Sequence, residues 1–205
     1  MAMVYEFQGL VPVIHPSAYV HPTAVLIGDV IIGPNCFVAP NTSLRGDFGR
    51  LILEEGVNFQ DNCVMHGLPE GDTVIEAFGH IGHGAIIHGA RIKRNVLVGM
   101  SAVVMDAAVI GEDSVVAACA FVKAGSVVPP RSLVAGVPAK KLRDITEKDL
   151  MWKTMMTAPY LELAKIAPGQ LKAAEPLSAP EPNRPRTAMS KQLAEAFPHG
   201  ANVKS

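Results

Sequence analysis

Aliphatic residues return at every sixth position over most of this chain. In the central part these positions hold Ile92, Val98, Val104, Ile110, Val116, Val122 and Val128. A small or β-branched residue stands four places after most of them, such as Val96 after Ile92 and Ala102 after Val98. A period of six matches neither the ~3.6-residue period of a helix nor the simple alternation of a strand. It predicts a solenoid in which very short strands are joined by tight corners.

The same period begins near the N-terminus and is interrupted three times. The first aliphatic positions are Ile14, Val20, Leu26, Ile32, Val38 and Leu44. Three extra residues follow Leu44, and one residue is missing between Ile87 and Ile92. The segment from Gly67 to Val74 is predicted to be a surface loop. Roughly twenty hexads between Ile14 and Ala139, stacked three to a coil, predict between six and seven coils.

The repeat ends near residue 140, where prolines interrupt the pattern, so we place a β-solenoid domain at residues 10–140. Thr146 followed by Asp149 is typical of a helix N-terminus and predicts a helical segment at residues 145–166. Pro159 should divide this segment into two helices. Residues 167–205 are rich in Pro, Ala and charge, which predicts an extended or disordered tail.

The composition agrees with a narrow solenoid that has small aliphatic side chains in its core. Of the 205 residues, 49% are hydrophobic but only 5% are aromatic, and 18 glycines and 16 prolines suit the corners. The net charge is −1 without basic clusters, so we expect neither nucleic acid nor a membrane as a partner. No apolar run approaches ~20 residues and no signal peptide is evident, which predicts a cytoplasmic protein. Cys36, Cys63 and Cys119 are expected to be reduced thiols in the core.

Several polar residues fall at equivalent positions of successive coils. Arg45, His66 and His88 each follow the aliphatic residue of their hexad directly, so they should form one outward column. Asp61 and His83 stand two places after theirs and should form a second column. Two imidazoles about 5 Å apart can share a tetrahedral metal ion, but a working site needs a third ligand and an open position. His83 projects from a different face, where it is placed to reach the pair of a neighbouring subunit around a threefold axis.

Three other histidines carry less information. His15 and His21 are expected to be solvated, because a single outward histidine of a solenoid usually is. His80 is a candidate for a contact at the edge of the site.

Four motifs resemble those of the γ-class carbonic anhydrase superfamily. They are RGD at Arg45–Asp47, NFQD at Asn58–Asp61, GHGAIIHG at Gly82–Gly89 and VGM at Val98–Met100. The resemblance implies a left-handed parallel β-helix of hexapeptide repeats with a C-terminal helix. It also implies a homotrimer that holds metal between subunits. A narrower resemblance, to the PaaY proteins of phenylacetate degradation and the CaiE proteins of carnitine metabolism, is carried by the segments SLRGDFGR, QDNCVMHG, GHIGHGAIIHG, LVGMSAVVMD and AFVKA.

The resemblance assigns roles to individual residues. His66 and His88 of one subunit and His83 of the next would bind zinc, or another divalent metal such as iron or cobalt. Gln60 would lie beside the open position and orient the bound water. Arg45, Asp47 and Asp61 would form an ion-pair network between subunits.

The chain departs from the archetypal enzyme directly after this RGD motif. Only Phe48 and Gly49 separate Asp47 from Arg50, so the acidic loop with a proton-shuttling glutamate is absent. Glu70 and Glu76 are the carboxylates that could replace it.

The resemblance therefore implies an enzyme that uses metal-activated hydroxide to hydrolyse acyl-CoA thioesters in phenylacetate degradation. The first alternative is reversible CO2 hydration by the same nucleophile. A hexapeptide-repeat acyltransferase without metal is a second alternative, and a non-catalytic assembly protein is a third.

Overall fold

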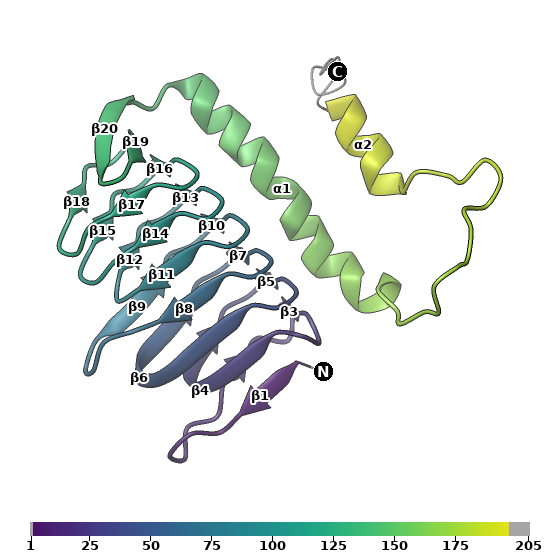
Figure 1. Ribbon diagram of the computed structural model, residues 1–205, viewed down its shortest axis with the longest axis horizontal. Helices are drawn as coiled ribbons and strands as arrows, with labels where there is room; N and C mark the ends of the chain where they lie inside the picture. The colour runs from purple at the N-terminus through teal and green to yellow at the C-terminus, as the bar shows by residue number, and fades with distance from the viewer. Residues whose placement is uncertain (1, 197–205) are drawn as a thin grey trace. The chain divides into compact units, whose positions relative to one another are not determined.

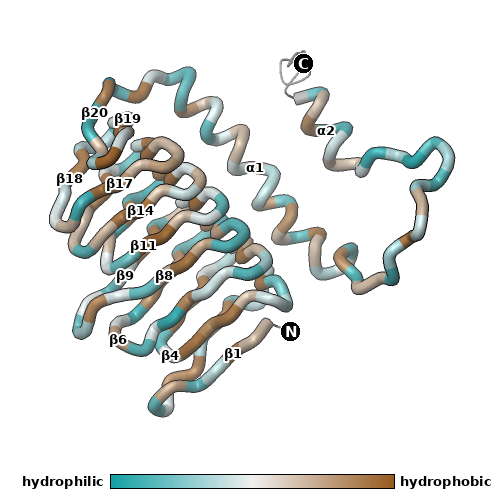
Figure 2. Tube along the Cα trace, in the orientation of Figure 1, coloured by the Kyte–Doolittle hydropathy of each residue, from teal (hydrophilic) through white to brown (hydrophobic). Residues whose placement is uncertain are grey.

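Stacked short strands form the three flat faces of a left-handed parallel β-helix in the computed structural model, which describes residues 2–196 (Figure 1). Inward and outward residues alternate along the strands. In β4 (Val25–Ile32), for example, Leu26, Val30 and Ile32 are buried. Hydrophobic stretches accordingly follow the strands in Figure 2. The predicted solenoid and its fold class are confirmed.

Two of the three faces belong to one twelve-stranded sheet. The first face contains β1 (Met3–Tyr5), β8 (Val64–His66), β11 (Ile86–His88), β14 (Val103–Val104) and β17 (Phe121–Val122). The second face contains β2 (Val13–Ile14), β9 (Asp72–Ile75), β12 (Arg91–Ile92), β15 (Val109–Ile110) and β18 (Val127–Val128). The long strands β4 and β6 (Ser43–Leu53) pass through both faces, because β6 pairs first with β8 and then with β9. The extra residues after Leu44 lie inside β6. The predicted loop from Gly67 is shorter than expected, since β9 begins at Asp72.

The third face is a separate sheet that carries the C-terminal helix. Its parallel strands are β3 (Tyr19–Val20), β5 (Phe37–Val38), β7 (Asn58–Phe59), β10 (His80–Ile81), β13 (Leu97–Val98), β16 (Val115–Val116) and β19 (Ser132–Gly136). A last strand, β20 (Ala139–Asp144), pairs antiparallel with β19. Seven stacked parallel strands agree with the predicted number of coils.

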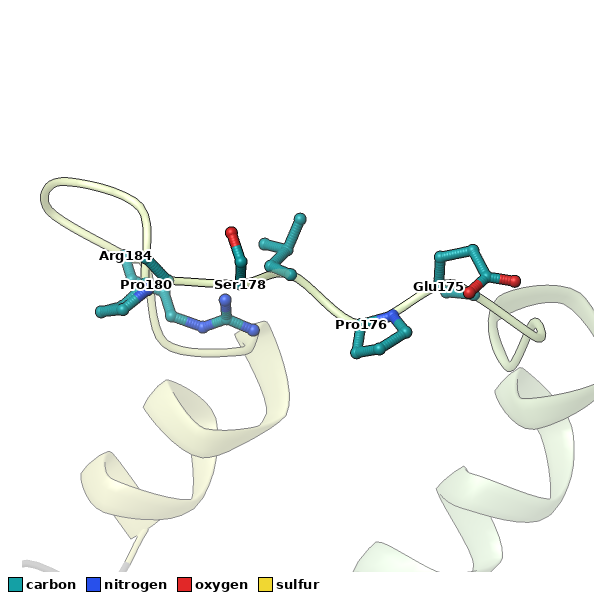
Figure 3. A pocket seen from close by; sticks show the side chains of 8 residues that line it. Glu175, Pro176, Ser178, Pro180 and Arg184 are labelled. Atoms are coloured by element: carbon teal, nitrogen blue, oxygen red, sulfur yellow. The ribbon is translucent and has the colours of Figure 1, made fainter.

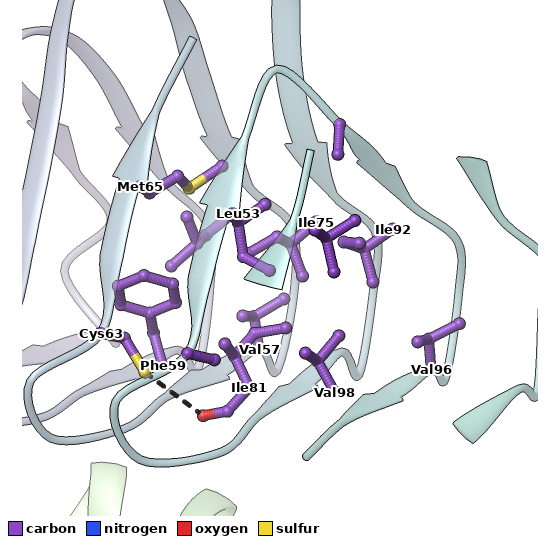
Figure 4. Close-up of a cluster of buried hydrophobic side chains, with 14 of the residues drawn as sticks. Leu53, Val57, Phe59, Cys63, Met65, Ile75, Ile81, Ile92, Val96 and Val98 are labelled. Carbon is purple, nitrogen blue, oxygen red and sulfur yellow. Dashed lines mark hydrogen bonds between the residues drawn. The ribbon is translucent and has the colours of Figure 1, made fainter. Parts of the chain in front are cut away.

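The interior of the β-helix is one continuous column of aliphatic side chains. Figure 4 shows its middle, where Leu53, Ile75 and Ile92 come from the second face and meet Phe59 and Ile81 from the third. All five side chains are fully buried. One residue is missing from the repeat between Ile87 and Ile92, but this leaves the column intact. The aliphatic residues of paired strands stay in register, as Ile75 does with Ile92.

Helix α1 (Glu147–Gln170) contacts strands of the third face. The predicted capping box is confirmed, since the Thr146 side chain accepts from the Asp149 amide and the Asp149 carboxylate accepts from the Thr146 amide. The prediction that Pro159 ends the first helix is wrong, because α1 continues through it. Proline removes one backbone donor, but residues on both sides of it, Thr157 and Ala164, are buried on the same helix. Tertiary packing therefore holds the two halves in one helix.

A second unit comprises residues 172–205. The prediction of an extended or disordered tail over 167–205 is wrong in two places, because α1 includes Gln170 and a helix α2 spans Ala188–Ala196. Residues 197–205 lie outside the described residues. A hollow lies along the segment from Ala174 to Arg184, but it is lined by none of the predicted site residues (Figure 3). Among the described residues, no helix combines the length and apolarity needed to cross a bilayer.

Candidate metal centre

His66 and His88 end neighbouring strands of the first face and lie directly side by side. They pair in register between β8 and β11, and Arg45 of β6 pairs with His66 on the other side. Nδ1 of His66 lies 3.0 Å from Nε2 of His88. The predicted outward column of Arg45, His66 and His88 is thus present. Within this column, Nδ1 of His66 and Nε2 of His88 point at each other.

A carboxylate lies behind each ring of this pair. Oδ1 of Asp47 lies 2.9 Å from Nε2 of His66, and Asp106 accepts a hydrogen bond from Nδ1 of His88. Burial acts to raise the pKa of the Asp47 carboxyl, but hydrogen bonds from Arg45 and His66 outweigh it and hold that pKa below its ordinary value. Sequence reasoning missed Asp106. The available signal was its place two residues after β14, the strand that follows β11 on this face.

The nitrogens of this pair fit a cation between them. Ionised carboxylates only accept hydrogen bonds, so the outer nitrogens of His66 and His88 must each carry a hydrogen. A neutral imidazole has one hydrogen, and the two inner nitrogens would then face each other with their lone pairs at 3.0 Å. That arrangement is repulsive unless a proton or metal ion lies between them. A tetrahedral zinc ion with ~2.0–2.1 Å bonds separates two ligand nitrogens by about 3.3 Å, which is close to the observed distance.

His83 lies at a corner of the β-helix and has its own carboxylate. Its Nδ1 is 2.8 Å from Oδ2 of Asp61, so its Nε2 remains available, and the side chains are 47% and 41% exposed. The second predicted column is therefore present. Within the part of the chain that the structure describes, no three His, Cys, Asp or Glu side chains form a metal-binding group. One subunit thus offers a pair of histidines and, separately, an exposed third.

Gln60 and His80 form a buried pair beneath α1. The Gln60 side-chain amide lies 2.7 Å from Nε2 of His80 and donates to Oδ1 of Asn58 at 2.9 Å. Nδ1 of His80 lies 3.2 Å from the hydroxyl of Thr157. Burial, with smaller contributions from the charges of Lys153 and His83, lowers the pKa of His80 to about 3. His80 is therefore neutral at physiological pH, and its contact with Gln60 joins it to a predicted site residue.

The remaining predicted site residues are engaged within the subunit. Arg45 pairs with Asp47 at 2.6 Å, whereas Asp61 pairs with His83. The exposed ring of Phe48 follows Asp47 and packs 5.2 Å from the ring of His66. After Asp47, where the acidic loop would begin, the chain therefore places an aromatic ring beside the candidate ligand.

The two carboxylates that could replace the missing acidic loop lie elsewhere. Glu76 follows β9 on the second face and pairs with Arg91 at 3.0 Å and Lys93 at 2.9 Å. Burial acts to raise its pKa, but hydrogen bonds from these cations dominate and lower it. Glu70 is an exposed residue of the turn before β9. Neither contacts the histidine pair.

Two of the three cysteines are buried free thiols, as predicted. Cys119 is exposed at a corner, so its prediction as a core thiol is wrong, because the neighbouring Ala120 takes the inward position. Burial raises the pKa of both the Cys36 and the Cys63 thiol to about 12. Thiols with such pKa values are poor nucleophiles at neutral pH.

We therefore expect Cys63→Ala to retain full activity. The side chain donates to the carbonyl of Gly82 at 3.1 Å, so its loss should lower the free energy of unfolding by roughly 1–2 kcal/mol. Urea unfolding and a steady-state activity assay measure the two effects. Loss of activity with retained metal would instead identify Cys63 as a nucleophile, and Cys36→Ala is the matched control.

Comparisons with known proteins agree with the repeat pattern. The family described as bacterial transferase hexapeptide (six repeats) matches residues 12–46 and 89–124. Two solved structures with the same fold are similar in sequence. A putative acetyltransferase of Bacillus cereus has 33% identity and a TM-score of 0.79, covering 80% of this chain and 95% of that one. A hexapeptide transferase family protein of Anaplasma phagocytophilum has 38% identity and a TM-score of 0.77, covering 82% and 98%.

Curated relatives match over nearly their whole length. The carnitine operon protein CaiE of Proteus sp. (strain LE138) is 54% identical over 183 residues, which are 89% of this chain and 93% of the relative. CaiE of Escherichia coli (strain K12) is 52% identical over 182 residues, with 89% and 93% covered. These relatives bear the name CaiE and not PaaY, so the prediction of a thioesterase of phenylacetate degradation is wrong. The chain belongs to the γ-class carbonic anhydrase-like hexapeptide-repeat proteins, among the relatives named CaiE.

Proposed function

We propose that this chain is a metal-dependent enzyme whose site is completed between the subunits of a homotrimer. The observation that carries the proposal is the pair of inner nitrogens of His66 and His88, which face each other at 3.0 Å. The partner subunit's His83 would be the third ligand, because its Nε2 is left available by Asp61. Zinc is the metal that this neutral imidazole set suits, and iron or cobalt could replace it.

The chain's own residues would hold the site in a fixed geometry. Asp47, Asp106 and Asp61 each accept from the outer nitrogen of one histidine, which fixes the tautomer and the orientation of each ring. When bound, a divalent ion lowers the pKa of a water ligand towards neutrality and so supplies a nucleophile for an electrophilic carbon. The Phe48 ring against His66 would form an apolar wall of the site and exclude bulk water.

The reaction that we propose is addition of water to a small electrophilic carbon, with CO2 hydration as its simplest case. Proton release should be slow, because Phe48 stands beside His66 and Glu76 is held by Arg91 and Lys93. We therefore expect weak CO2 hydration. The name of the curated relatives directs the search for a physiological substrate to compounds of carnitine metabolism.

Acyl transfer is the second candidate function. It is favoured by the description of the matching family as transferases and by the similar structure named as a putative acetyltransferase. In that case, acetyl-CoA would lose its acyl group only when an acceptor is present, and turnover would persist after metal removal.

Metal analysis and two assays distinguish the candidates. We expect the purified protein to hold about one divalent ion per subunit and to hydrate CO2 in a reaction that a chelator abolishes and added zinc restores. Metal-free protein with acceptor-dependent consumption of acetyl-CoA would overturn the metal proposal in favour of acyl transfer. His21→Ala is the control that should change neither result, because among the described residues the His21 side chain hydrogen-bonds only to neighbouring Thr23.

We expect Arg45→Ala to weaken the trimer. Arg45 holds Asp47 at 2.6 Å, and Asp47 in turn holds His66, so the change loosens the face on which the subunits would meet. The concentration at which the trimer dissociates should rise at least ~10-fold, since each 1.4 kcal/mol corresponds to about a factor of ten. Light scattering across a dilution series measures it. Arg94→Ala removes an exposed ion pair with Glu112 and should leave assembly unchanged. An unchanged trimer for Arg45→Ala would show that Arg45 does not lie in the subunit interface.

A further inference from the structure

A line of buried hydrogen bonds joins a predicted site residue to helix α1. The Gln60 amide nitrogen lies 2.7 Å from Nε2 of His80, and Nδ1 of His80 lies 3.2 Å from the Thr157 hydroxyl. The relative exposures of Gln60, His80 and Thr157 are 2%, 8% and 4%. Water therefore cannot replace these partners freely, and each group depends on the next for its hydrogen bond.

The available hydrogens fix the direction of every bond in this line. Thr157 donates its single hydroxyl hydrogen to the carbonyl of Lys153 at 3.0 Å, one helical turn earlier. Its oxygen therefore accepts from Nδ1–H of His80. The buried His80 ring is neutral and carries one hydrogen. Its Nε2 must therefore accept, and the donor is the Gln60 amide.

This direction determines which end of the Gln60 side chain remains free. The amide nitrogen has two hydrogens and uses them for Nε2 of His80 and Oδ1 of Asn58. The carbonyl oxygen receives no hydrogen bond from the described residues. Among the described residues, the fully buried side-chain atoms without a hydrogen-bond partner are Tyr19 Oη and Asn58 Nδ2, and the Gln60 carbonyl oxygen is not one of them. The result is an acceptor of fixed orientation that has no hydrogen-bond partner among the described residues.

We propose that His80 and Thr157 are positioning residues that keep the Gln60 carbonyl oxygen turned towards the water or substrate of the shared site. The inference rests on the proposed function. The two ends of a carboxamide have nearly the same shape but opposite hydrogen-bonding character. If the Gln60 carboxamide were turned around, its NH2 group would face the water in place of the carbonyl oxygen. That water must donate a hydrogen bond at this point, so its orientation would be lost. Helix α1 thus contributes to the site through one hydroxyl group.

The test uses the metal-loaded full chain with Thr157→Val and Thr157→Ser. Valine keeps the shape of threonine but offers no acceptor, so the His80 hydrogen should move to Nε2 and turn the Gln60 carbonyl inward. Serine keeps the hydroxyl and is the matched control. 15N NMR of histidine-labelled protein reports the tautomer, and steady-state CO2 hydration with metal analysis reports kcat, KM and occupancy.

We expect the Nδ1–H tautomer of His80 in the wild type and in Thr157→Ser, and the Nε2–H tautomer in Thr157→Val. The kcat of Thr157→Val should fall about tenfold, with KM and metal content unchanged. An Nε2–H tautomer in the wild type would overturn the orientation of Gln60. A changed tautomer with full turnover would overturn its role while leaving the proposed function intact. Absence of metal-dependent turnover in the wild type would contradict the proposed function itself, whereas the tautomer would still decide the orientation of Gln60.

Discussion

His66→Ala and His83→Ala homotrimers should each lose nearly all bound metal, and an equal mixture refolded together should recover about a quarter of it. Each homotrimer lacks one ligand at every site. In the mixture, a site is whole only where a chain with intact His66 meets a neighbour with intact His83. Random mixing in a closed ring makes that probability one half times one half, which is about a quarter.

Metal content and CO2 hydration should recover together in the mixed sample. Native mass spectrometry verifies that the chains have mixed. His15→Ala co-refolded with wild type is the control and should leave every site occupied, since the His15 side chain hydrogen-bonds only to neighbouring Ser17 within the part of the chain that the structure describes. Recovery near zero in demonstrably mixed trimers would show that each site is built from one chain.

The histidine pair could be predicted because the repeat fixes where residues stand. Residues at the same hexad position of successive coils lie one strand apart, so the spacing of His66 and His88 was enough to place them together. The same reasoning placed His83 away from this pair, at the corner position that it shares with Asp61. Periodicity is therefore informative about neighbours along a face.

Periodicity was less informative where the coils change length or where the helix packs. Asp106 stands two places after Val104, whereas His88 stands one place after Ile87, so equal hexad position did not reveal their contact. The bond between His80 and Thr157 joins residues 77 positions apart. Only the docking of α1 brings them together, and that docking also carries the helix through Pro159. Tertiary packing, unlike the repeat, leaves no regular spacing in the sequence.

Lys153 should make the protein more stable as the pH rises from about 8 to 10.5. It is 1% exposed, and its ammonium group donates to the carbonyl of Phe78 at 2.7 Å and to Oδ1 of Asn95 at 2.5 Å. Burial lowers its pKa to about 8, although the charge of Asp113 opposes this. Between that pH and the ordinary value of 10.5, the unfolded chain binds a proton that the folded chain has lost. Stability rises with pH wherever the unfolded state binds more protons.

The comparison of wild type with Lys153→Met isolates this contribution. The difference in free energy of unfolding between them should grow in favour of the wild type by about 3 kcal/mol over this window, since one pKa unit corresponds to ~1.4 kcal/mol. Tyrosine ionisation at high pH affects both proteins equally and cancels. Urea unfolding at several pH values measures the difference, and Lys148→Met, at an exposed lysine of the same helix, should show no such change. A pH-independent difference between wild type and Lys153→Met would mean that Lys153 stays charged when buried, held by Phe78 and Asn95.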